Sequence, residues 1–151
     1  VATALLNNTD AAEDVLGDFF ISFVKSAERI KLNGNLKAYM ATCVATLARN
    51  LIKRRQLEPT GLEDDSAIES ADLTPDLLAM QREEAAILNL AMSKLPYEQR
   101  EIIILHLHAN LKFTQIAKLR STSVNTVRSR YRYGLEKLRS LLNSEVKNEI
   151  A

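Results

Sequence analysis

The stretch that most constrains the fold of this chain covers residues 113–142, where two amphipathic segments flank a short polar turn. In both segments apolar residues recur with the 3.6-residue period of a helix. They are Phe113, Ile116, Ala117 and Leu119 in the first segment, and Val124, Val127, Tyr131, Leu135, Leu138 and Leu142 in the second. Ser123 precedes the second segment, and its hydroxyl is suited to cap the free N–H groups there. The pattern predicts a helix-turn-helix.

The second of these helices is basic and polar away from its apolar stripe. Residues 112–139 hold eight Lys and Arg against one Glu. A solvated basic face is the ordinary alternative for such a helix, but here the charge has one sign and follows a turn of helix-turn-helix length. We therefore predict that this helix reads a DNA major groove. Its predicted DNA-binding residues are those able to bond phosphates and base edges, namely Asn125, Thr126, Arg128, Ser129, Arg130, Arg132 and Tyr133.

The composition indicates an all-α protein. Four Gly and three Pro in 151 residues, with few β-branched runs, favour helices throughout. No apolar run approaches the ~20 residues that span a bilayer, so we expect no membrane insertion and a cytoplasmic location. The lone Cys43 lies on an apolar stripe and is expected to be an inert thiol.

The net charge of +1 conceals segregated charge. Residues 1–56 hold eight basic and five acidic side chains, and residues 81–151 hold twelve basic and seven acidic ones. Residues 57–80, between them, hold seven acidic side chains and no basic one. An acidic segment with two prolines and a glycine is typical of a linker. The sequence therefore predicts two small helical domains, 1–57 and 81–151, joined by an acidic linker over 58–80.

Two long helices are predicted in the first domain. The segment 10–30 carries a wide apolar stripe, with Asp10 and Glu13 as a capping pair. Gly17 in its interior is either a close helix contact or a tolerated defect. The segment 36–56 repeats apolar residues at helical spacing and ends in basic residues. That stripe consists of Leu36, Met40, Cys43, Leu47 and Leu51.

Two further helices are predicted before the helix-turn-helix. One covers 81–95, with Ala85, Leu88, Ala91, Met92 and Leu95 on one face. Pro96 then starts a helix that is apolar nearly all round, as expected at the centre of a small bundle.

The sequence offers no recognisable catalytic or metal-binding pattern. His106 and His108 are two residues apart, so one metal ion cannot be held by both from a helix, and we expect packing histidines. Glycine-rich phosphate loops and catalytic carboxylate pairs are missing as well. We therefore predict a binding protein rather than an enzyme, without a cofactor or metal.

Three segments together resemble the extracytoplasmic function (ECF) sigma factors, the small two-domain promoter-recognition subunits of bacterial RNA polymerase. These segments read AAEDVLGDFFISF at 11–23, YMATCVATLARNLIKRR at 39–55 and LPYEQREIIILHLHANLKFTQIAKLRSTSVNTVRSRYRYGLEKLR at 95–139. In the last segment Ile116-Ala117, Thr126-Val127 and Ser129-Arg130 fall at the spacing of the family without a gap. Arg120-Ser121 replaces the usual Leu-Gly at the turn.

The resemblance implies a protein that binds core RNA polymerase and directs promoter recognition in transcription initiation. Asp14 and Asp18 would contact polymerase, and the helix from Ser123 would read the upstream promoter element. The loop at 33–37 and the helix after it would hold the downstream element, through Lys37, Tyr39, Arg49, Lys53 and Arg54. The alternative is a sigma-like helix-turn-helix regulator, or partner-binding module, that does not load polymerase.

The resemblance also raises expectations about the first domain and its partners. Only nine residues precede the first matched helix, so we expect the N-terminal helix of the region-2-like domain to be missing. With one other long helix to cover it, the apolar face of 10–51 should stay partly exposed and bind an anti-sigma factor or a second copy of the chain. We further expect the two domains to move independently. The opposing hypothesis is a closed form in which the acidic linker covers the basic helix.

Overall fold

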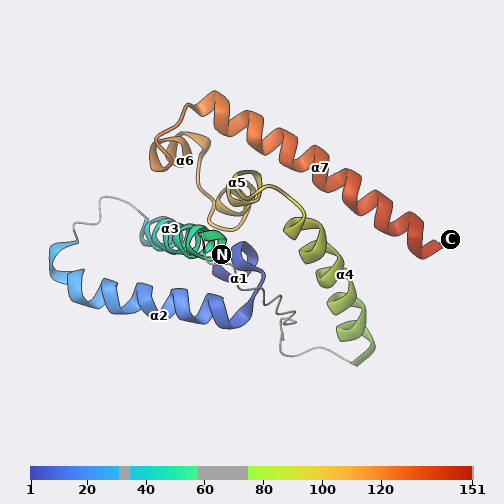
Figure 1. The fold of residues 1–151 in the computed structure, drawn as a ribbon, viewed down its shortest axis with the longest axis horizontal. Helices are drawn as coiled ribbons and strands as arrows, with labels where there is room; N and C mark the ends of the chain where they lie inside the picture. Colours follow the sequence, from blue (N-terminus) through green and yellow to red (C-terminus); the bar gives the residue numbers. More distant parts are fainter. Residues whose placement is uncertain (31–34, 58–74, 151) are drawn as a thin grey trace.

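The computed structural model describes residues 1–30, 35–57 and 75–150, and every element in these ranges is a helix (Figure 1). The elements are α1 (Ala2–Leu6), α2 (Thr9–Ser26), the 3-10 helix η1 (Ala27–Arg29), α3 (Leu36–Leu57), α4 (Pro75–Ser93), α5 (Tyr97–Leu107), α6 (Phe113–Leu119) and α7 (Val124–Ile150). The predicted all-α class is confirmed. Among these helices, none is both long enough and apolar enough to cross a lipid bilayer.

Helix α2 starts at Thr9, one residue before the predicted range 10–30, and ends at Ser26. Its N-cap is Asn8, whose backbone is extended and whose side-chain oxygen accepts a hydrogen bond from the Ala11 N–H at 2.7 Å. The predicted capping pair of Asp10 and Glu13 is therefore wrong, because both residues lie inside the helix. An Asn at this position satisfies one of the free N–H groups of the first turn.

The short helix α1 was not expected from the sequence. Its Leu5 is fully buried, and α1 contacts α2, α3 and α5. Five residues are too few to show a helical period, so only the tertiary contacts reveal this element. The first residues of the chain thus belong to the core.

Helix α3 buries two different sides. The predicted stripe holds partly buried residues that pack toward α2, such as Met40, Cys43 and Leu47, although Leu36 is exposed. The more deeply buried residues are small ones on another side, Ala41, Ala45 and Ala48. Because alanine side chains are short, α3 can approach a neighbouring helix closely on this side.

The C-terminal segment packs around α5. Residues 102–105 of α5 are buried, which confirms the predicted central helix, and both α6 and α7 pack on it. Helix α7 continues past α5 and also contacts α4 (Figure 1). The predicted inner face of the preceding helix is corrected by the structure, since Ala85 and Leu88 are exposed and Ala91 is buried.

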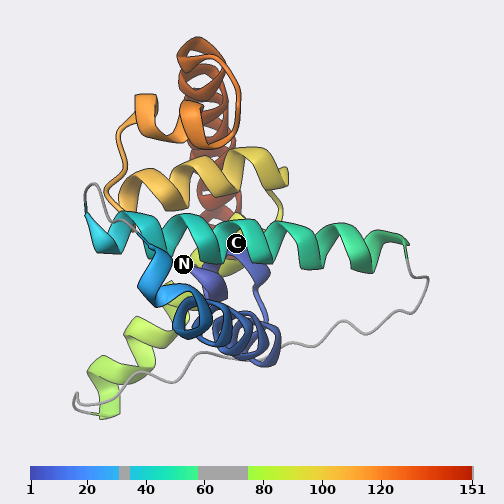
Figure 2. The same cartoon turned by 90° about the vertical axis from the view of Figure 1, so that its left-hand side faces the viewer.

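The N-terminal and C-terminal segments are in contact. Helices α3 and α5 lie side by side, seen end-on in Figure 1 and lengthwise in Figure 2. One hydrophobic cluster contains Leu5, Ala45, Ile102 and Ile116, and therefore joins both segments. We call this packing of α3 on α5 the closed arrangement.

The closed arrangement differs from the expected independence of the two domains. Its contacts come from α1, α3 and α5. The alternative hypothesis, in which the acidic linker covers the basic helix, concerns residues 58–74, which lie outside the described residues. Helix α4 begins at Pro75, inside the range 58–80 assigned to the linker.

Candidate nucleic-acid interface

The turn between α6 and α7 ends the first helix with a left-handed residue. Ser121 has a φ of 49°. Its N–H donates to the Lys118 carbonyl at 3.3 Å, and the Thr122 N–H donates to the Ala117 carbonyl at 3.0 Å. This pair of bonds is the Schellman motif, in which glycine usually takes the left-handed position. The turn therefore has helix-turn-helix geometry with a serine in place of the glycine.

Helix α7 then restarts at the predicted cap. The Thr126 N–H donates to Ser123 Oγ at 3.0 Å, and the hydroxyls of Ser123 and Thr126 lie 2.8 Å apart. The predicted N-cap is therefore confirmed. The cap fixes the start of α7 relative to α6, and with it the direction in which the first two turns of α7 project their side chains.

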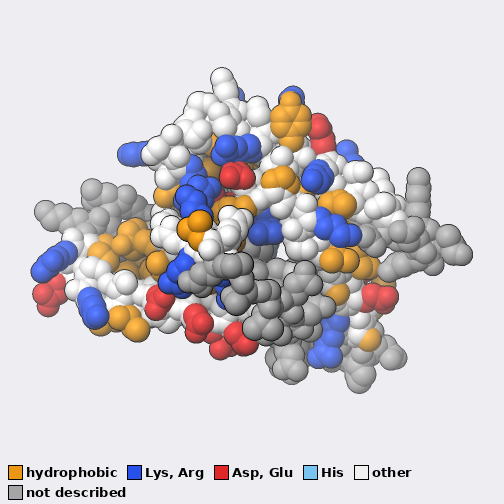
Figure 3. Space-filling view, viewed as in Figure 1, with side chains coloured by type: hydrophobic (Ala, Val, Ile, Leu, Met, Phe, Trp, Pro, Cys, Tyr) orange, Lys and Arg blue, Asp and Glu red, His pale blue; other side chains and the backbone are white. Residues whose placement is uncertain are grey.

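The first three turns of α7 present polar side chains to solvent. Asn125, Ser129 and Arg132 follow each other at helical spacing and are all exposed. Arg128 is exposed and Arg130 half-buried, while Tyr133 is 51% exposed and carries the Arg132 guanidinium over its ring at 5.0 Å. Lys and Arg side chains gather over α6 and α7 in Figure 3. The predicted residues of α7 are thus available to a groove and to phosphates.

Further predicted DNA-binding residues lie on α3. Lys53 and Arg54 are exposed at its end, and Lys37 is exposed at its start, where its N–H donates to Asn35 Oδ1 at 2.9 Å. Tyr39 is half-buried. Arg49 differs from these residues, because its side chain is only 25% exposed and points to α5. An internal partner on α5 holds the Arg49 side chain.

That partner is Glu101, a buried carboxylate that sequence reasoning missed. Glu101 is 1% exposed and accepts hydrogen bonds from Arg49 Nη2 at 2.8 Å and from Arg120 at the end of α6. The Tyr97 hydroxyl lies 3.3 Å from the same carboxylate. We call Arg49, Tyr97, Glu101 and Arg120 the Glu101 cluster. The signal in the sequence was an acidic residue that interrupts the apolar surroundings of a buried helix.

The electrostatics of the Glu101 cluster reflect burial. Burial raises the pKa of the Glu101 carboxyl, and the Arg120 and Arg49 guanidiniums oppose that rise. Burial likewise raises the pKa of Tyr97 and lowers that of Arg120. Two guanidiniums also lie over the Tyr97 ring, with Arg49 at 5.5 Å and Arg100 at 5.6 Å from its centroid. Two arginines from different segments therefore depend on one carboxylate.

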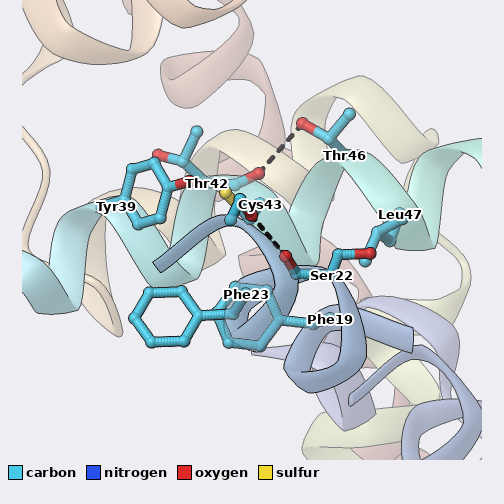
Figure 4. Close-up of a pocket in the computed structure, with 9 residues that line it drawn as sticks. Phe19, Ser22, Phe23, Tyr39, Thr42, Cys43, Thr46 and Leu47 are labelled. Atoms are coloured by element: carbon cyan, nitrogen blue, oxygen red, sulfur yellow. Dashed lines mark hydrogen bonds between the residues drawn. The ribbon is translucent and has the colours of Figure 1, made fainter. Parts of the chain in front are cut away.

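A pocket of about 280 Å³ opens between α2 and α3 (Figure 4). Phe19 and Phe23 line it from α2, and Tyr39 and Cys43 line it from α3. The Phe23 and Tyr39 rings are 6.5 Å apart. Serine and threonine hydroxyls complete the lining, so the pocket can accept a flat ring with polar edges. The remaining lining residues are Ser22, Ser26, Thr42, Thr46 and Leu47.

Helix α2 exposes an apolar and acidic face. Phe20 is 52% exposed, Ile21 56% and Val24 72%, and Asp14 and Asp18 are exposed on the same helix. Hydrophobic side chains show at the surface near the C-terminal half of α2, at the left of Figure 3. The expectation that the apolar surface of this helix is incompletely covered is confirmed. Such a patch usually marks a site for another protein.

The structure confirms packing for one of the two histidines, His106, whereas His108 is exposed, so the prediction is wrong for His108. His106 stacks on Phe113 with a centroid distance of 4.4 Å and contacts Tyr131 edge-on, while its Nδ1 lies 2.8 Å from the Leu111 carbonyl oxygen. His106 therefore joins α5 to α6 and α7. Within 1–30, 35–57 and 75–150, no group of three or more His, Cys, Asp or Glu residues could hold a metal ion.

Comparisons with known proteins agree with this interface. Residues 85–138 match the family described as Sigma-70, region 4. The chain is 28% identical to the RNA polymerase sigma factor CarQ of Myxococcus xanthus, over 97% of this chain and 83% of the relative. It is 25% identical to the ECF RNA polymerase sigma factor EcfG of Rhodopseudomonas palustris, over 93% of this chain and 76% of that one.

A solved structure shares the fold across both segments. The sigma factor RpoE of Bartonella quintana, solved with the anti-sigma factor NepR, matches 94% of this chain and 87% of its own with a TM-score of 0.74 at 22% identity. The helix-turn-helix of this chain thus lies in the segment that matches region 4, and the full-length relatives are named as sigma factors of RNA polymerase. Residues 85–138 thus match the Sigma-70, region 4 family, and over most of its length the chain is similar to extracytoplasmic function (ECF) sigma factors.

Proposed function

We propose that this chain binds core RNA polymerase and directs it to promoters, with α7 reading the upstream promoter element. The observation that carries the proposal is the capped basic helix α7, which lies in the segment matched to Sigma-70, region 4. Base edges would be read by Asn125, Thr126 and Ser129, while Arg128, Arg130 and Arg132 would contact phosphates and Tyr133 would pack on the backbone. The polymerase and the DNA that it transcribes lie in the cytoplasm of bacteria, and we expect the chain to act there.

The downstream promoter element would be held by α3 and the loop before it. Lys37, Lys53 and Arg54 supply positive charge along this helix, and Arg49 lies on the same helix. The pocket beside Tyr39 has the size and the aromatic lining to receive an unstacked base. Opening of a promoter produces such bases. We therefore propose residues 1–57 as a region-2-like module and residues 81–151 as a region-4-like module, with 58–80 between them.

Polymerase would bind the exposed face of α2. Asp14 and Asp18 supply the charge of this face, and Phe20 and Val24 supply its apolar area. The same face is suited to an anti-sigma factor, and the relative of known structure was solved with one. A second copy of the chain is the competing occupant. Because function here consists of binding, we propose no catalytic role for any residue.

Binding to bacterial core RNA polymerase tests the proposal. We expect the chain to elute with core polymerase in size-exclusion chromatography, and Asp14→Ala with Asp18→Ala to weaken that complex. Glu98→Gln is the matched control, because Glu98 is an exposed acid on α5, outside the proposed face. A chain that binds DNA but never binds core polymerase would instead be the sigma-like regulator. Light scattering of the chain alone detects self-association through α2.

A further inference from the structure

The Glu101 cluster joins the two proposed DNA-binding modules through one carboxylate. Arg49 comes from α3, Arg120 from the end of α6, and both guanidiniums bond Glu101 of α5. The Tyr97 hydroxyl lies 3.4 Å from the Ala45 carbonyl oxygen of α3 and therefore adds a second polar contact between the modules. The Glu101 cluster therefore makes two polar contacts with α3, one through the Arg49 side chain and one through the Ala45 backbone carbonyl.

Arg49 is also a proposed contact of the downstream promoter element. It lies one turn before Lys53 on α3, so the two side chains share a face of the helix. In the closed arrangement its charge is already paired with Glu101, and only 25% of its side chain is exposed. A phosphate cannot replace Glu101 as its partner unless the side chain leaves the interface with α5.

The apolar part of the interface is built from small side chains. Ala45 and Ala48 are fully buried in the hydrophobic cluster that also holds Ile102 and Leu105 of α5. An alanine side chain buries little apolar area, and hydrophobic stabilisation is roughly proportional to the buried apolar area. The ion pair therefore carries more of the specificity of this interface than it would between large side chains.

The polar part of the interface is incompletely satisfied. In the described part of the chain, Arg49 Nε and Arg120 Nε are buried and have no hydrogen-bond partner. Buried donors without partners oppose burial, and a charge-assisted bond to a buried carboxylate favours it. Opening would let water reach these donors. The closed arrangement is thus stabilised by the ion pair of Arg49 with Glu101 and destabilised by the two buried donors without partners, and opening would remove this destabilisation.

From these observations we infer that the pairing of Arg49 with Glu101 is an autoinhibitory contact, which holds α3 against α5 and keeps Arg49 from promoter DNA until the chain opens. The inference rests on the proposed promoter contacts of α3 and α7. Most recognition residues of α7 are exposed in the closed arrangement, among them Asn125, Arg128 and Arg132, so the upstream element alone should bind without opening. DNA that carries both elements should bind fully only after opening.

The Glu101→Gln variant tests this inference in the full chain. Glutamine keeps the shape of the side chain and removes the charge that attracts Arg49. We expect about tenfold tighter binding of a promoter fork that carries both elements, because the apparent dissociation constant is the intrinsic one divided by the fraction of open chain, and that fraction rises. The readout is the ratio of fork affinity to the affinity for a duplex with the upstream element alone, because this ratio cancels any effect on the helix-turn-helix through Arg120. Glu98→Gln, an exposed acid on the same helix, is the control and should match the parent in both assays.

A second variant covers the case in which Glu101→Gln does not fold. Arg49→Gln removes only the α3 side of the cluster and leaves Arg120 paired with Glu101, so the helix-turn-helix keeps its support. We expect unchanged helix content by circular dichroism and a larger radius of gyration by X-ray scattering. An unchanged radius for Arg49→Gln would overturn the inference, as would an equal ratio of fork to duplex affinity in parent and folded Glu101→Gln. If the parent binds neither DNA, the proposed function fails instead.

Discussion

Arg49 of α3 donates a hydrogen bond to Glu101 of α5 at 2.8 Å, across a separation of 52 residues. The same carboxylate bonds Arg120, which immediately precedes the left-handed Ser121 of the helix-turn-helix. A buried charge is tolerated when it is paired and hydrogen-bonded. One acidic side chain therefore connects the packing of α3, the position of α5 and the turn that aims α7.

Removing the arginines of α7 should weaken DNA binding at every sequence. For the triple variant Arg128→Ala, Arg130→Ala and Arg132→Ala, we expect the slope of log affinity against log salt to fall by about 3, because each phosphate contact contributes about 0.9. Fluorescence anisotropy at several salt concentrations measures both quantities. Arg82→Ala, an exposed arginine on α4, should leave the slope unchanged. A folded triple variant with the affinity and slope of the parent would exclude α7 as the phosphate-binding element.

Changing Asn125 should alter sequence preference instead. Its amide lies on the exposed face of α7 and can make paired hydrogen bonds to a base edge. For Asn125→Ala we expect a loss of about 1 to 3 kcal/mol at one base position, with little change at non-specific DNA. Selection of bound sequences from a random DNA library compares the sequence preference of the parent with that of Asn125→Ala. Identical selected sequences for parent and variant would show that Asn125 reads no base.

The serine at the turn makes the helix-turn-helix less stable than it could be. Ser121 has a φ of 49°, where a side chain costs about 1 kcal/mol relative to glycine. Ser121→Gly should therefore raise the free energy of unfolding by about 1 kcal/mol. Ser140→Gly, at an exposed position inside α7, should lower it by about 0.5 kcal/mol. Urea unfolding measures both, and a loss of stability in Ser121→Gly would mean that the serine side chain contributes more than its backbone costs.

Two glycines should respond to alanine in opposite ways. A Cβ at Gly134 would lie 2.8 Å from Ile103 Cδ1 and 3.2 Å from Gln99 Cβ, so the buried Ile103 side chain would have to move and α7 would have to shift slightly from α5. We expect Gly134→Ala to destabilise the chain by about 1 to 3 kcal/mol. A Cβ at Gly17 meets nothing within 4 Å, and Gly17→Ala should stabilise α2 by about 1 kcal/mol. Thermal unfolding of both variants checks the contrast, and equal shifts of the two would contradict it.

The sequence predicted those parts of the fold that local patterns determine. The period of apolar residues located α2, α3, α5, α6 and α7, and the hydroxyl of Ser123 located the cap of α7. The sequence is compatible with Gly17 as either a close helix contact or a tolerated defect, and the structure favours the defect, because a Cβ there meets nothing within 4 Å. In each case the determining interaction lies within a few residues along the chain.

Interactions between distant residues were not predictable in this way. The contact of Arg49 with Glu101 depends on how α3 packs on α5. Small residues such as Ala45 and Ala48 permit this packing, but in the sequence the stripe of larger residues, with Met40 and Leu47, is the stronger signal for the buried side of α3. The fully buried Leu5 lies in a helix too short to show a period. The closed arrangement could therefore not be predicted from the sequence and is seen only in the three-dimensional structure.

Reconstituted transcription tests the central claim most directly. Core polymerase, the chain and a fragmented bacterial genome are incubated with nucleotides, and the 5′ ends of the transcripts are sequenced. We expect discrete start sites that need the chain, share two upstream sequence elements and disappear with the Arg128, Arg130 and Arg132 triple variant. If the chain binds DNA but the start sites are the same with and without it, the chain does not direct initiation and the account is wrong.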